Sequence, residues 1–148
     1  MSFKISAPNS SNKTQWLKLW QDYLVFYKED LPSEITQLTW QRILDSNEPV
    51  NAFIIYNDNE VVGFTHYLFH RSTWAKNNYC YLEDLFVTEK VRGKGCASAL
   101  INAVREAAKQ NNCERLYWVT GESNTVARSL YDKMAEKTEY FQYRLGVE

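Results

Sequence analysis

The feature that most constrains this chain is a predicted strand that passes through a two-glycine turn into an amphipathic helix. The strand spans Tyr79 to Val87, the turn spans Arg92 to Gly95, and the helix spans Cys96 to Gln110. Apolar side chains in the helix recur at the spacing of one helix face, while polar side chains occupy the other. A strand that leads into such a helix is typical of an α/β protein, in which helices cover the faces of a sheet.

The two-glycine turn has the composition of an anion-binding loop. Glycine permits positive φ and close backbone approach, so successive N–H groups can converge on an anion. The helix N-terminus adds unpaired N–H groups and partial positive charge. Lys90, Arg92 and Lys94 add cations to the same short segment. The turn therefore predicts a phosphate-binding site, with a tight turn that carries solvated lysines as the alternative.

Two common nucleotide-binding motifs do not match this turn. A P-loop ends in Gly-Lys-Ser or Gly-Lys-Thr, whereas Gly95 is followed by Cys96. A dinucleotide-binding fingerprint needs a third glycine where Ser98 stands, and it lies close to the first strand of its domain. Neither motif accounts for the segment.

The rest of the chain shows no internal repeat and no linker that would divide it, so residues 1–148 are expected to form a single domain. Hydrophobic periodicity and turn residues predict a strand at Phe3–Ala7, helices at about 9–27 and 32–45, a hairpin of residues 52–56 and 61–69, a strand at Leu116–Thr120, a helix at Asn124–Met134 and a last strand at Glu139–Leu145. This order predicts a mixed α/β sandwich with helices on both faces of one sheet.

Composition and charge exclude several classes of protein. The chain carries 17 Lys+Arg and 18 Asp+Glu, and a net charge of −1 argues against a general nucleic-acid binder. Its three cysteines have no CxxC spacing, which argues against a disulfide framework and against a zinc site. The N-terminus lacks the apolar stretch of a signal peptide, and no apolar run reaches the ~18 residues of a membrane span. We expect a cytoplasmic protein that binds no nucleic acid, membrane or metal.

The turn and its surroundings resemble the GNAT superfamily of acyl-CoA-dependent N-acetyltransferases. Residues 92–97 (Arg-Gly-Lys-Gly-Cys-Ala) match its Arg/Gln-x-x-Gly-x-Gly/Ala motif, and residues 81–87 (Tyr-Leu-Glu-Asp-Leu-Phe-Val) look like the strand of spermidine/spermine acetyltransferases. The stretch from Tyr117 to Tyr131 is similar to the histone/polyamine branch. The resemblance covers essentially Val50 to Leu145. It implies a GNAT-type mixed central β-sheet with a splayed CoA-binding strand pair, and direct acetyl transfer from acetyl-CoA to an amine without a metal.

The resemblance also implies which residues bind the cofactor. The backbone of Leu85, Phe86 and Val87 would pair with the pantetheine arm, with the Leu85 amide directed at the thioester carbonyl. Asn124 would contact the pantetheine, and Tyr131 would lie beside the CoA sulfur. The backbone residues that would hold the CoA pyrophosphate are Arg92, Gly93, Lys94, Gly95, Cys96 and Ala97.

Acid–base chemistry gives these residue types a reason. An attacking ammonium must lose a proton, and a departing thiolate can gain one from a phenol. We predict Tyr131 as the proton donor and Glu83 as the base. Asp84, a substrate-binding candidate, would point to the opposite face of the strand unless a bulge redirects one of the two carboxylates.

Simpler roles remain open for several of these candidates. Asn124 is also a good N-cap for its helix, and Tyr131 is also a plausible core aromatic. His66 and His70 are expected to be structural or to line the substrate. Cys96 is expected to serve packing rather than chemistry.

The predicted loop between the first two helices is acidic and bears on the substrate. Glu29, Asp30 and Glu34, together with Asp84, would attract a cationic small amine such as a polyamine, with a plain solvated loop as the alternative. Two rival functions remain. The protein could acetylate a lysine or the N-terminus of another protein, or it could bind acyl-CoA without catalysis. The apolar last strand predicts a homodimer built around it.

Overall fold

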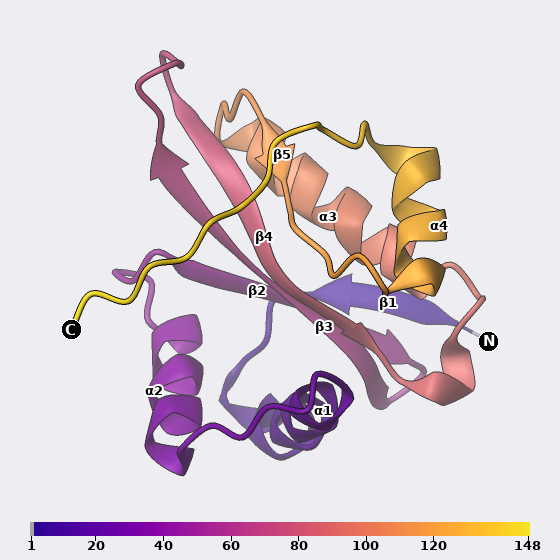
Figure 1. Cartoon of the computed structure of the whole chain (residues 1–148). Coiled ribbons are helices and arrows are strands. Elements are labelled where there is room, and N and C mark those ends of the chain that lie inside the picture. Colours follow the sequence, from indigo (N-terminus) through magenta and orange to yellow (C-terminus); the bar gives the residue numbers. More distant parts are fainter. Residues whose placement is uncertain (1) are drawn as a thin grey trace. The chain divides into compact units, whose positions relative to one another are not determined.

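A mixed β-sheet forms the centre of the first part of the chain, and helices cover both of its faces (Figure 1). The computed structural model describes residues 2–148, which divide into one unit that ends at Trp118 and a second unit, Val119–Glu148. The elements are β1 (Phe3–Ser6), a 3₁₀ turn (Ser10–Asn12), α1 (Lys13–Phe26), α2 (Ser33–Leu44), β2 (Val50–Asn57), β3 (Glu60–Arg71), β4 (Asn78–Val87), a 3₁₀ turn (Glu89–Val91), α3 (Cys96–Gln110), β5 (Leu116–Tyr117) and, in the second unit, α4 (Thr125–Met134).

The strands of the sheet lie in chain order, β1-β2-β3-β4-β5. The pairs from β1 to β4 are antiparallel, and β4 pairs with β5 in parallel. The β4–β5 ladder contains only Cys80 opposite Leu116 and Tyr81 opposite Tyr117, whereas β4 continues to Val87. This mixed sheet, with a parallel pair that separates early, confirms the predicted fold class.

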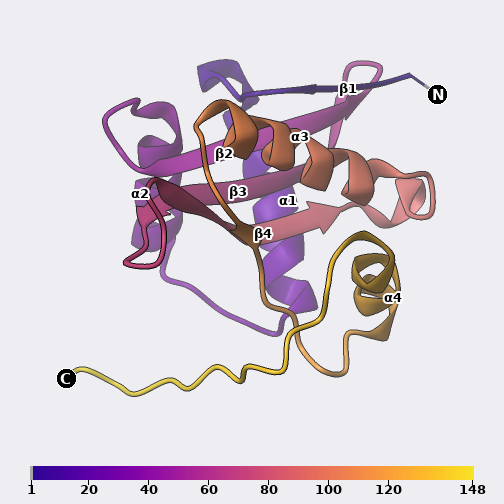
Figure 2. The ribbon, with the colours of Figure 1, turned by 90° about the horizontal axis from the view of Figure 1, so that it is seen from above.

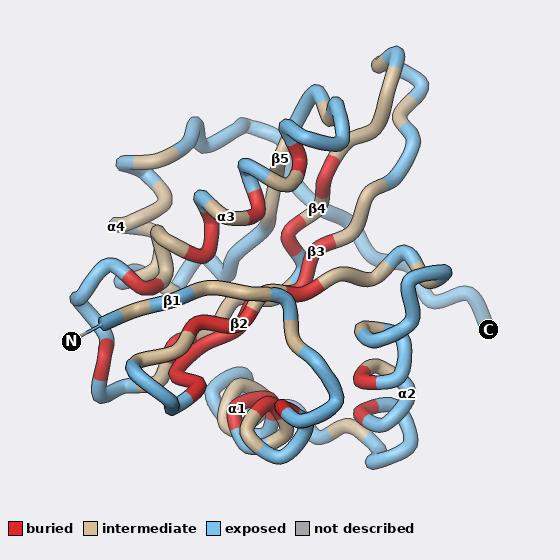
Figure 3. Tube along the Cα trace, turned by 180° about the vertical axis from the view of Figure 1, so that it is seen from behind, coloured by how far each residue is buried: buried red, intermediate tan, exposed pale blue. Residues whose placement is uncertain are grey.

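Two apolar layers hold the helices against the sheet, with α3 on one face and α1 and α2 on the other (Figure 2). On one face, tryptophans of α1 and α2 pack against Ile54 and Phe64. On the other face, Leu100 of α3 packs against Ile55 and Val62. Ile54 and Ile55 are adjacent in β2 and point to opposite faces because side chains alternate along a strand. The buried segments consequently concentrate in the central strands and on the inner sides of the helices (Figure 3).

Helix α3 confirms its prediction from hydrophobic periodicity, including both ends. Its buried residues recur on one face, as the sequence pattern required: Cys96, Leu100, Ile101, Val104 and Ala108. The side chains predicted to face water are exposed: Asn102, Arg105, Glu106 and Lys109. The pattern alone was sufficient because this helix buries a single stripe against a sheet.

Two strand predictions in the C-terminal part of the chain were wrong. The strand expected at Leu116–Thr120 ends at Tyr117, because its pairing with β4 ends there. The strand expected at Glu139–Leu145 does not form in this single chain, although its apolar residues alternate as predicted. A strand exists only through hydrogen bonds to a neighbouring strand, and no backbone hydrogen bond involves residues 136–148 in the described chain.

The structure describes the three cysteines and the helices of residues 2–148. Cys80, Cys96 and Cys113 are all free thiols. Within residues 2–148, no helix combines the length and the apolar character needed to cross a membrane.

Gly63 in β3 lies where no larger residue fits. A Cβ atom there would lie 2.8 Å from the Phe86 carbonyl oxygen and 2.9 Å from Ile55 Cγ2. Gly63→Ala should therefore destabilise the protein by about 1–3 kcal/mol, the usual cost of overpacking a core. Chemical denaturation measures the change. Gly121→Ala is the control, since a Cβ there meets no atom within 4 Å, and equal stability of the two variants would contradict the packing argument.

Candidate active site

The glycine turn presents a row of free backbone amides at the start of α3. Gly93 and Gly95 adopt φ values of 77° and 84°, which favour glycine. Gly95 occupies the N-cap position, and no side chain caps the helix. Among residues 2–148, the amides from Gly93 to Ser98 donate no hydrogen bond. These amides lie at the N-terminus of a 15-residue helix, where the sequence predicts an anion-binding site.

The side-chain cations near this turn are used differently from the prediction. Arg92 folds back on β4, where its Nε donates a 3.2 Å hydrogen bond to the Val87 carbonyl oxygen and its guanidinium lies 5.8 Å from the Phe86 ring centre. Lys90 forms an ion pair with Glu60. Lys94 is exposed at the turn itself. Of the three predicted cations, Arg92 and Lys90 thus have partners within the chain, whereas the amides of Gly93 to Ser98 donate no hydrogen bond among the described residues.

Cys96, the first residue of α3, is buried with 2% of its surface exposed. Burial raises the pKa of its thiol, and nearby Lys94 opposes this only in part. A protonated, buried thiol is unreactive. The prediction that Cys96 serves packing is confirmed.

The last residues of β4 have no strand beside them on the side of β5, because β5 pairs only with Cys80 and Tyr81. Asp84 and Phe86 carry their carbonyl groups on the side of β3: Thr65 Oγ1 donates to the Asp84 oxygen at 2.8 Å, and the Phe86 oxygen lies close to Gly63. Because backbone groups alternate along a strand, the amides of Leu85 and Val87 point to the opposite edge. Two of the three backbone binders predicted in this strand, Leu85 and Val87, thus face the open edge, whereas the Phe86 amide faces β3.

A β-bulge interrupts β4 at the two candidate carboxylates. His66 pairs with Asp84 and Tyr67 pairs with Leu82, so Glu83 is the extra residue. Glu83 is exposed, whereas Asp84 is half-buried. A bulge redirects side chains from simple alternation. The bulge that the sequence analysis left open as an exception is therefore present, so strict alternation does not decide where Glu83 and Asp84 point.

Tyr81 and its neighbours form an aromatic group beside Glu83. The Tyr81 hydroxyl donates a hydrogen bond to Glu83, and burial, followed by this carboxylate, raises the pKa of Tyr81 to about 12. The Tyr117 ring lies 5.0 Å from the Tyr81 ring, and Tyr117 Oη lies 2.6 Å from His70 Nε2. Glu83 is therefore bordered by rings whose faces attract cations.

Asp84 takes part in a partly buried hydrogen-bond network. The Tyr23 hydroxyl donates to Asp84 Oδ1 at 2.8 Å, and His66 Nδ1 lies 2.9 Å from Oδ2. His66 is 2% exposed and contacts Trp16, which confirms it as a structural residue. The sequence did not reveal this group, because Tyr23, His66 and Asp84 come from three elements and no spacing rule links them.

The acidic loop lies between α1 and α2 and is open to solvent. Glu29, Asp30 and Glu34 are exposed, and neither Glu29 nor Asp30 forms an ion pair with a described residue. Their charges are therefore available to attract a cation.

The second unit contains the two remaining candidates, Asn124 and Tyr131. Asn124 stands at the N-cap of α4, but its side chain does not cap the helix and instead donates to Thr120 Oγ1 at 3.4 Å. Tyr131 is half-buried on α4. Many helices end in a left-handed residue, where glycine is favoured. Helix α4 instead ends at Ala135 in an extended conformation, with a φ of −146°, so alanine is accommodated there.

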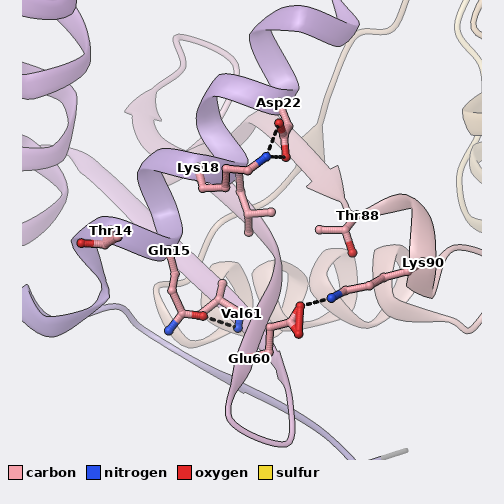
Figure 4. A pocket seen from close by; sticks show the side chains of 9 residues that line it. Thr14, Gln15, Lys18, Asp22, Glu60, Val61, Thr88 and Lys90 are labelled. Atoms are coloured by element: carbon pink, nitrogen blue, oxygen red, sulfur yellow. Dashed lines mark hydrogen bonds and ion pairs between the residues drawn. The ribbon is translucent and has the colours of Figure 1, made fainter.

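A cavity of about 460 Å³ lies between α1 and the start of β3 (Figure 4). Ion pairs Lys18–Asp22 and Glu60–Lys90 stand at its wall. Its lining residues are Thr14, Gln15, Lys18, Leu19, Asp22, Glu60, Val61, Thr88 and Lys90. Lys90 is the one residue of the predicted phosphate-binding turn in this lining, and none of the predicted catalytic or substrate-binding residues lines the cavity.

The family, the relatives and the solved structure that this chain resembles are all acetyltransferases. The acetyltransferase (GNAT) family matches residues 14–135. D-amino-acid N-acetyltransferase HPA3 of Saccharomyces cerevisiae is 32% identical over 142 residues, which cover 95% of this chain and 88% of that protein. Thialysine N-epsilon-acetyltransferase of Caenorhabditis elegans is 28% identical over 104 residues, which cover 67% of this chain and 64% of that protein. The structure of AAC(6')-Iy with a CoA-S-monomethyl-acetylneamine bisubstrate analog has a TM-score of 0.86 at 20% identity over 99% of each chain.

The fold and the glycine turn define an α/β protein in which the N-terminus of α3 carries free backbone amides. The extent of the family match shows that the chain belongs to the GNAT acetyltransferase family. It is an acetyl-CoA-dependent N-acetyltransferase, as the sequence predicted. An enzyme is therefore favoured over the non-catalytic binding module.

Proposed function

We propose that this enzyme acetylates a primary amine of a small cationic molecule, such as a polyamine or a basic amino acid. The observation that carries this proposal is the pair of carboxylates at the β4 bulge, one exposed and one half-buried. Two negative charges bordered by aromatic rings favour a cationic substrate. The names of the relatives support amines of amino-acid size, since they act on D-amino acids and on thialysine.

In this proposal Glu83 is the general base and Tyr131 is the general acid. Glu83 accepts a proton from the substrate ammonium, so that the amine has a lone pair for attack on the acetyl carbonyl carbon. The Leu85 amide donates a hydrogen bond to the carbonyl oxygen as negative charge develops there. As the carbon–sulfur bond breaks, the Tyr131 hydroxyl supplies a proton to the sulfur, and the proton that the new amide nitrogen loses restores the Tyr131 hydroxyl.

Acetyl-CoA supplies the activated acetyl group, and the residues of the glycine turn suit its pyrophosphate. The free amides from Gly93 to Ala97 would bind the phosphates, and the open edge at Leu85 and Val87 would pair with the pantetheine arm. Asn124 would contact the pantetheine arm. We treat residues 1–148 as one acetyltransferase domain, because the family match runs across the boundary between the two units.

A panel assay tests the proposed function. Purified protein with acetyl-CoA would be given spermidine, thialysine, D- and L-amino acids, an aminoglycoside and a lysine peptide, and release of the CoA thiol would be followed. We expect amine-dependent release that is fastest with a small cationic amine. Fastest release with the peptide would establish the protein-amine alternative, and release with uncharged amino acids alone would refute a cationic substrate.

Neutralising the acidic loop should weaken binding of a cationic amine. In Glu29→Gln/Asp30→Asn/Glu34→Gln, we expect KM for the preferred cationic amine to rise several-fold at low ionic strength, with kcat unchanged. The effect should shrink with added salt, because exposed charges are screened within ~10 Å at 0.1 M salt. The matched control is Glu106→Gln on the exposed face of α3. An unchanged KM would mean that the loop is only solvated.

We also propose that the enzyme is a cytoplasmic homodimer that uses its C-terminal segment, residues 139–148. Tyr140, Phe141, Tyr143 and Leu145 are 84–92% exposed, and an alternating apolar segment of this kind suits pairing with a strand of a second copy. Light scattering at micromolar concentration should give the dimer mass, and truncation after Glu139 should give the monomer mass. A monomer mass for the full chain would refute the proposal.

A further inference from the structure

Four side chains from three elements form one chain of hydrogen bonds behind the β4 bulge, buried at Trp16 and His66 and half-buried at Tyr23 and Asp84. Trp16 and Tyr23 come from α1, His66 from β3 and Asp84 from β4. Trp16 Nε1 lies 3.0 Å from His66 Nε2, His66 Nδ1 lies 2.9 Å from Asp84 Oδ2, and the Tyr23 hydroxyl lies 2.8 Å from Asp84 Oδ1. Polar side chains buried in this way lock one another's positions when each hydrogen bond is satisfied.

The hydrogen bonds determine the form of His66. The Trp16 indole can only donate, so His66 Nε2 must be an acceptor and carries no proton. His66 Nδ1 therefore carries the ring's single proton and donates it to Asp84. The imidazole is neutral, and no lysine or arginine of the described chain pairs with Asp84. Asp84 thus keeps an uncompensated negative charge beside Glu83.

Thr65, His66 and Tyr23 together hold Asp84 at the bulge. Thr65 Oγ1 donates to the Asp84 carbonyl oxygen at 2.8 Å, while His66 and Tyr23 hold both carboxylate oxygens. Glu83 is the bulged residue directly before Asp84, so its direction depends on how firmly Asp84 is held. Burial, followed by the Asp84 charge, raises the pKa of the Tyr23 hydroxyl, which therefore remains a donor at all working pH values.

We propose that His66 and Tyr23 are positioning residues, which act through Asp84 to fix the bulge that presents Glu83 to the substrate amine. The inference rests on the proposed function, in which Glu83 is the base. Asp84 in this scheme does not bind the amine directly, because both carboxylate oxygens are already held. It contributes negative charge and a fixed backbone.

Two matched substitutions of His66 separate positioning from general stability. In His66→Asn, the amide nitrogen takes the place of Nδ1 and keeps the hydrogen bond to Asp84. In His66→Gln, the amide oxygen of the longer side chain takes the place of Nε2. This variant keeps the hydrogen bond from Trp16 and loses the one to Asp84. We expect both variants to lose thermal stability, whereas kcat should fall about 10-fold or more in His66→Gln and Tyr23→Phe and much less in His66→Asn.

The experiment measures kcat and both KM values with acetyl-CoA and thialysine, together with amide hydrogen exchange at residues 83–85. Exchange there should become faster in His66→Gln and Tyr23→Phe but not in His66→Asn, whether or not thialysine is the best substrate. KM for acetyl-CoA should not change. Equal loss of kcat and equal exchange in the Asn and Gln variants would overturn the inference.

A double-mutant cycle with Glu83→Gln distinguishes failure of this inference from failure of the proposed function. If the network acts through Glu83, His66→Gln should cost little further activity once Glu83 is replaced. A full additional loss in the double variant would overturn the positioning role. Full activity of Glu83→Gln alone would instead refute Glu83 as the base.

Discussion

Glu83→Gln should lower kcat/KM for amine acetylation at pH 7 by about 10²–10⁴-fold, the range that general-base catalysis contributes. A primary amine with a pKa near ~10 is almost wholly protonated at pH 7, and an ammonium group has no lone pair for attack. Glutamine retains the size of Glu83 and accepts a hydrogen bond from Tyr81, but it cannot take up a proton. Glu83 is exposed on the bulge of β4, so the substitution should leave the fold intact.

The pH dependence separates a base from a mere contact. The deficit of Glu83→Gln should shrink as the pH rises toward the pKa of the amine, because the free amine then needs no base. The rates would be measured by thiol release between pH 7 and 10. Glu89→Gln, exposed on the 3₁₀ turn after β4, is the matched control and should retain activity. A deficit of the same size at every pH would show that Glu83 binds substrate without acting as the base.

Tyr131→Phe should lower kcat by about 10²-fold, with the affinity for acetyl-CoA unchanged. The phenol is assigned to protonate the departing thiolate. A thiol pKa of ~8.5 makes that thiolate a fair leaving group without help, so we expect the lower end of the range for acid catalysis. Phenylalanine keeps the ring of Tyr131, which is half-buried on α4, and removes only the hydroxyl.

Two measurements are needed to interpret this variant. Thiol release gives kcat, and calorimetry with CoA gives the dissociation constant of the cofactor. Tyr140→Phe is the matched control, since Tyr140 is 84% exposed in the C-terminal segment. If Tyr131→Phe weakened CoA binding as much as it slowed turnover, the hydroxyl would be a cofactor contact rather than an acid.

Local sequence patterns were sufficient for the elements that depend on local forces. Helix α3 follows from its apolar spacing, and the turn before it follows from two glycines that adopt positive φ. Asn9 caps the 3₁₀ turn before α1, and its side chain accepts from the Ser11 amide, as is usual for this residue type. Residue type and spacing carry this information because each feature involves only neighbours along the chain.

The arrangement around Glu83 could not be predicted in the same way. Alternation alone would place Glu83 and Asp84 on opposite faces, and whether a bulge intervenes depends on how β3 pairs with β4. The pairing of His66 with Asp84 and Tyr23 requires that α1 lie across the sheet. The early end of β5 and the missing last strand likewise depend on partners that the local pattern does not specify.

Residue types at fixed local spacing were enough to predict the glycine turn and to show the resemblance to the GNAT superfamily, which implies acetyl-CoA as the donor. The tertiary structure decided which carboxylate is exposed and which is held. Glu83 is redirected by the bulge, while Asp84 is fixed by Tyr23 and a neutral His66. The physical reason is that hydrogen bonds between distant elements form only after the sheet and α1 have packed together, so no local pattern encodes them.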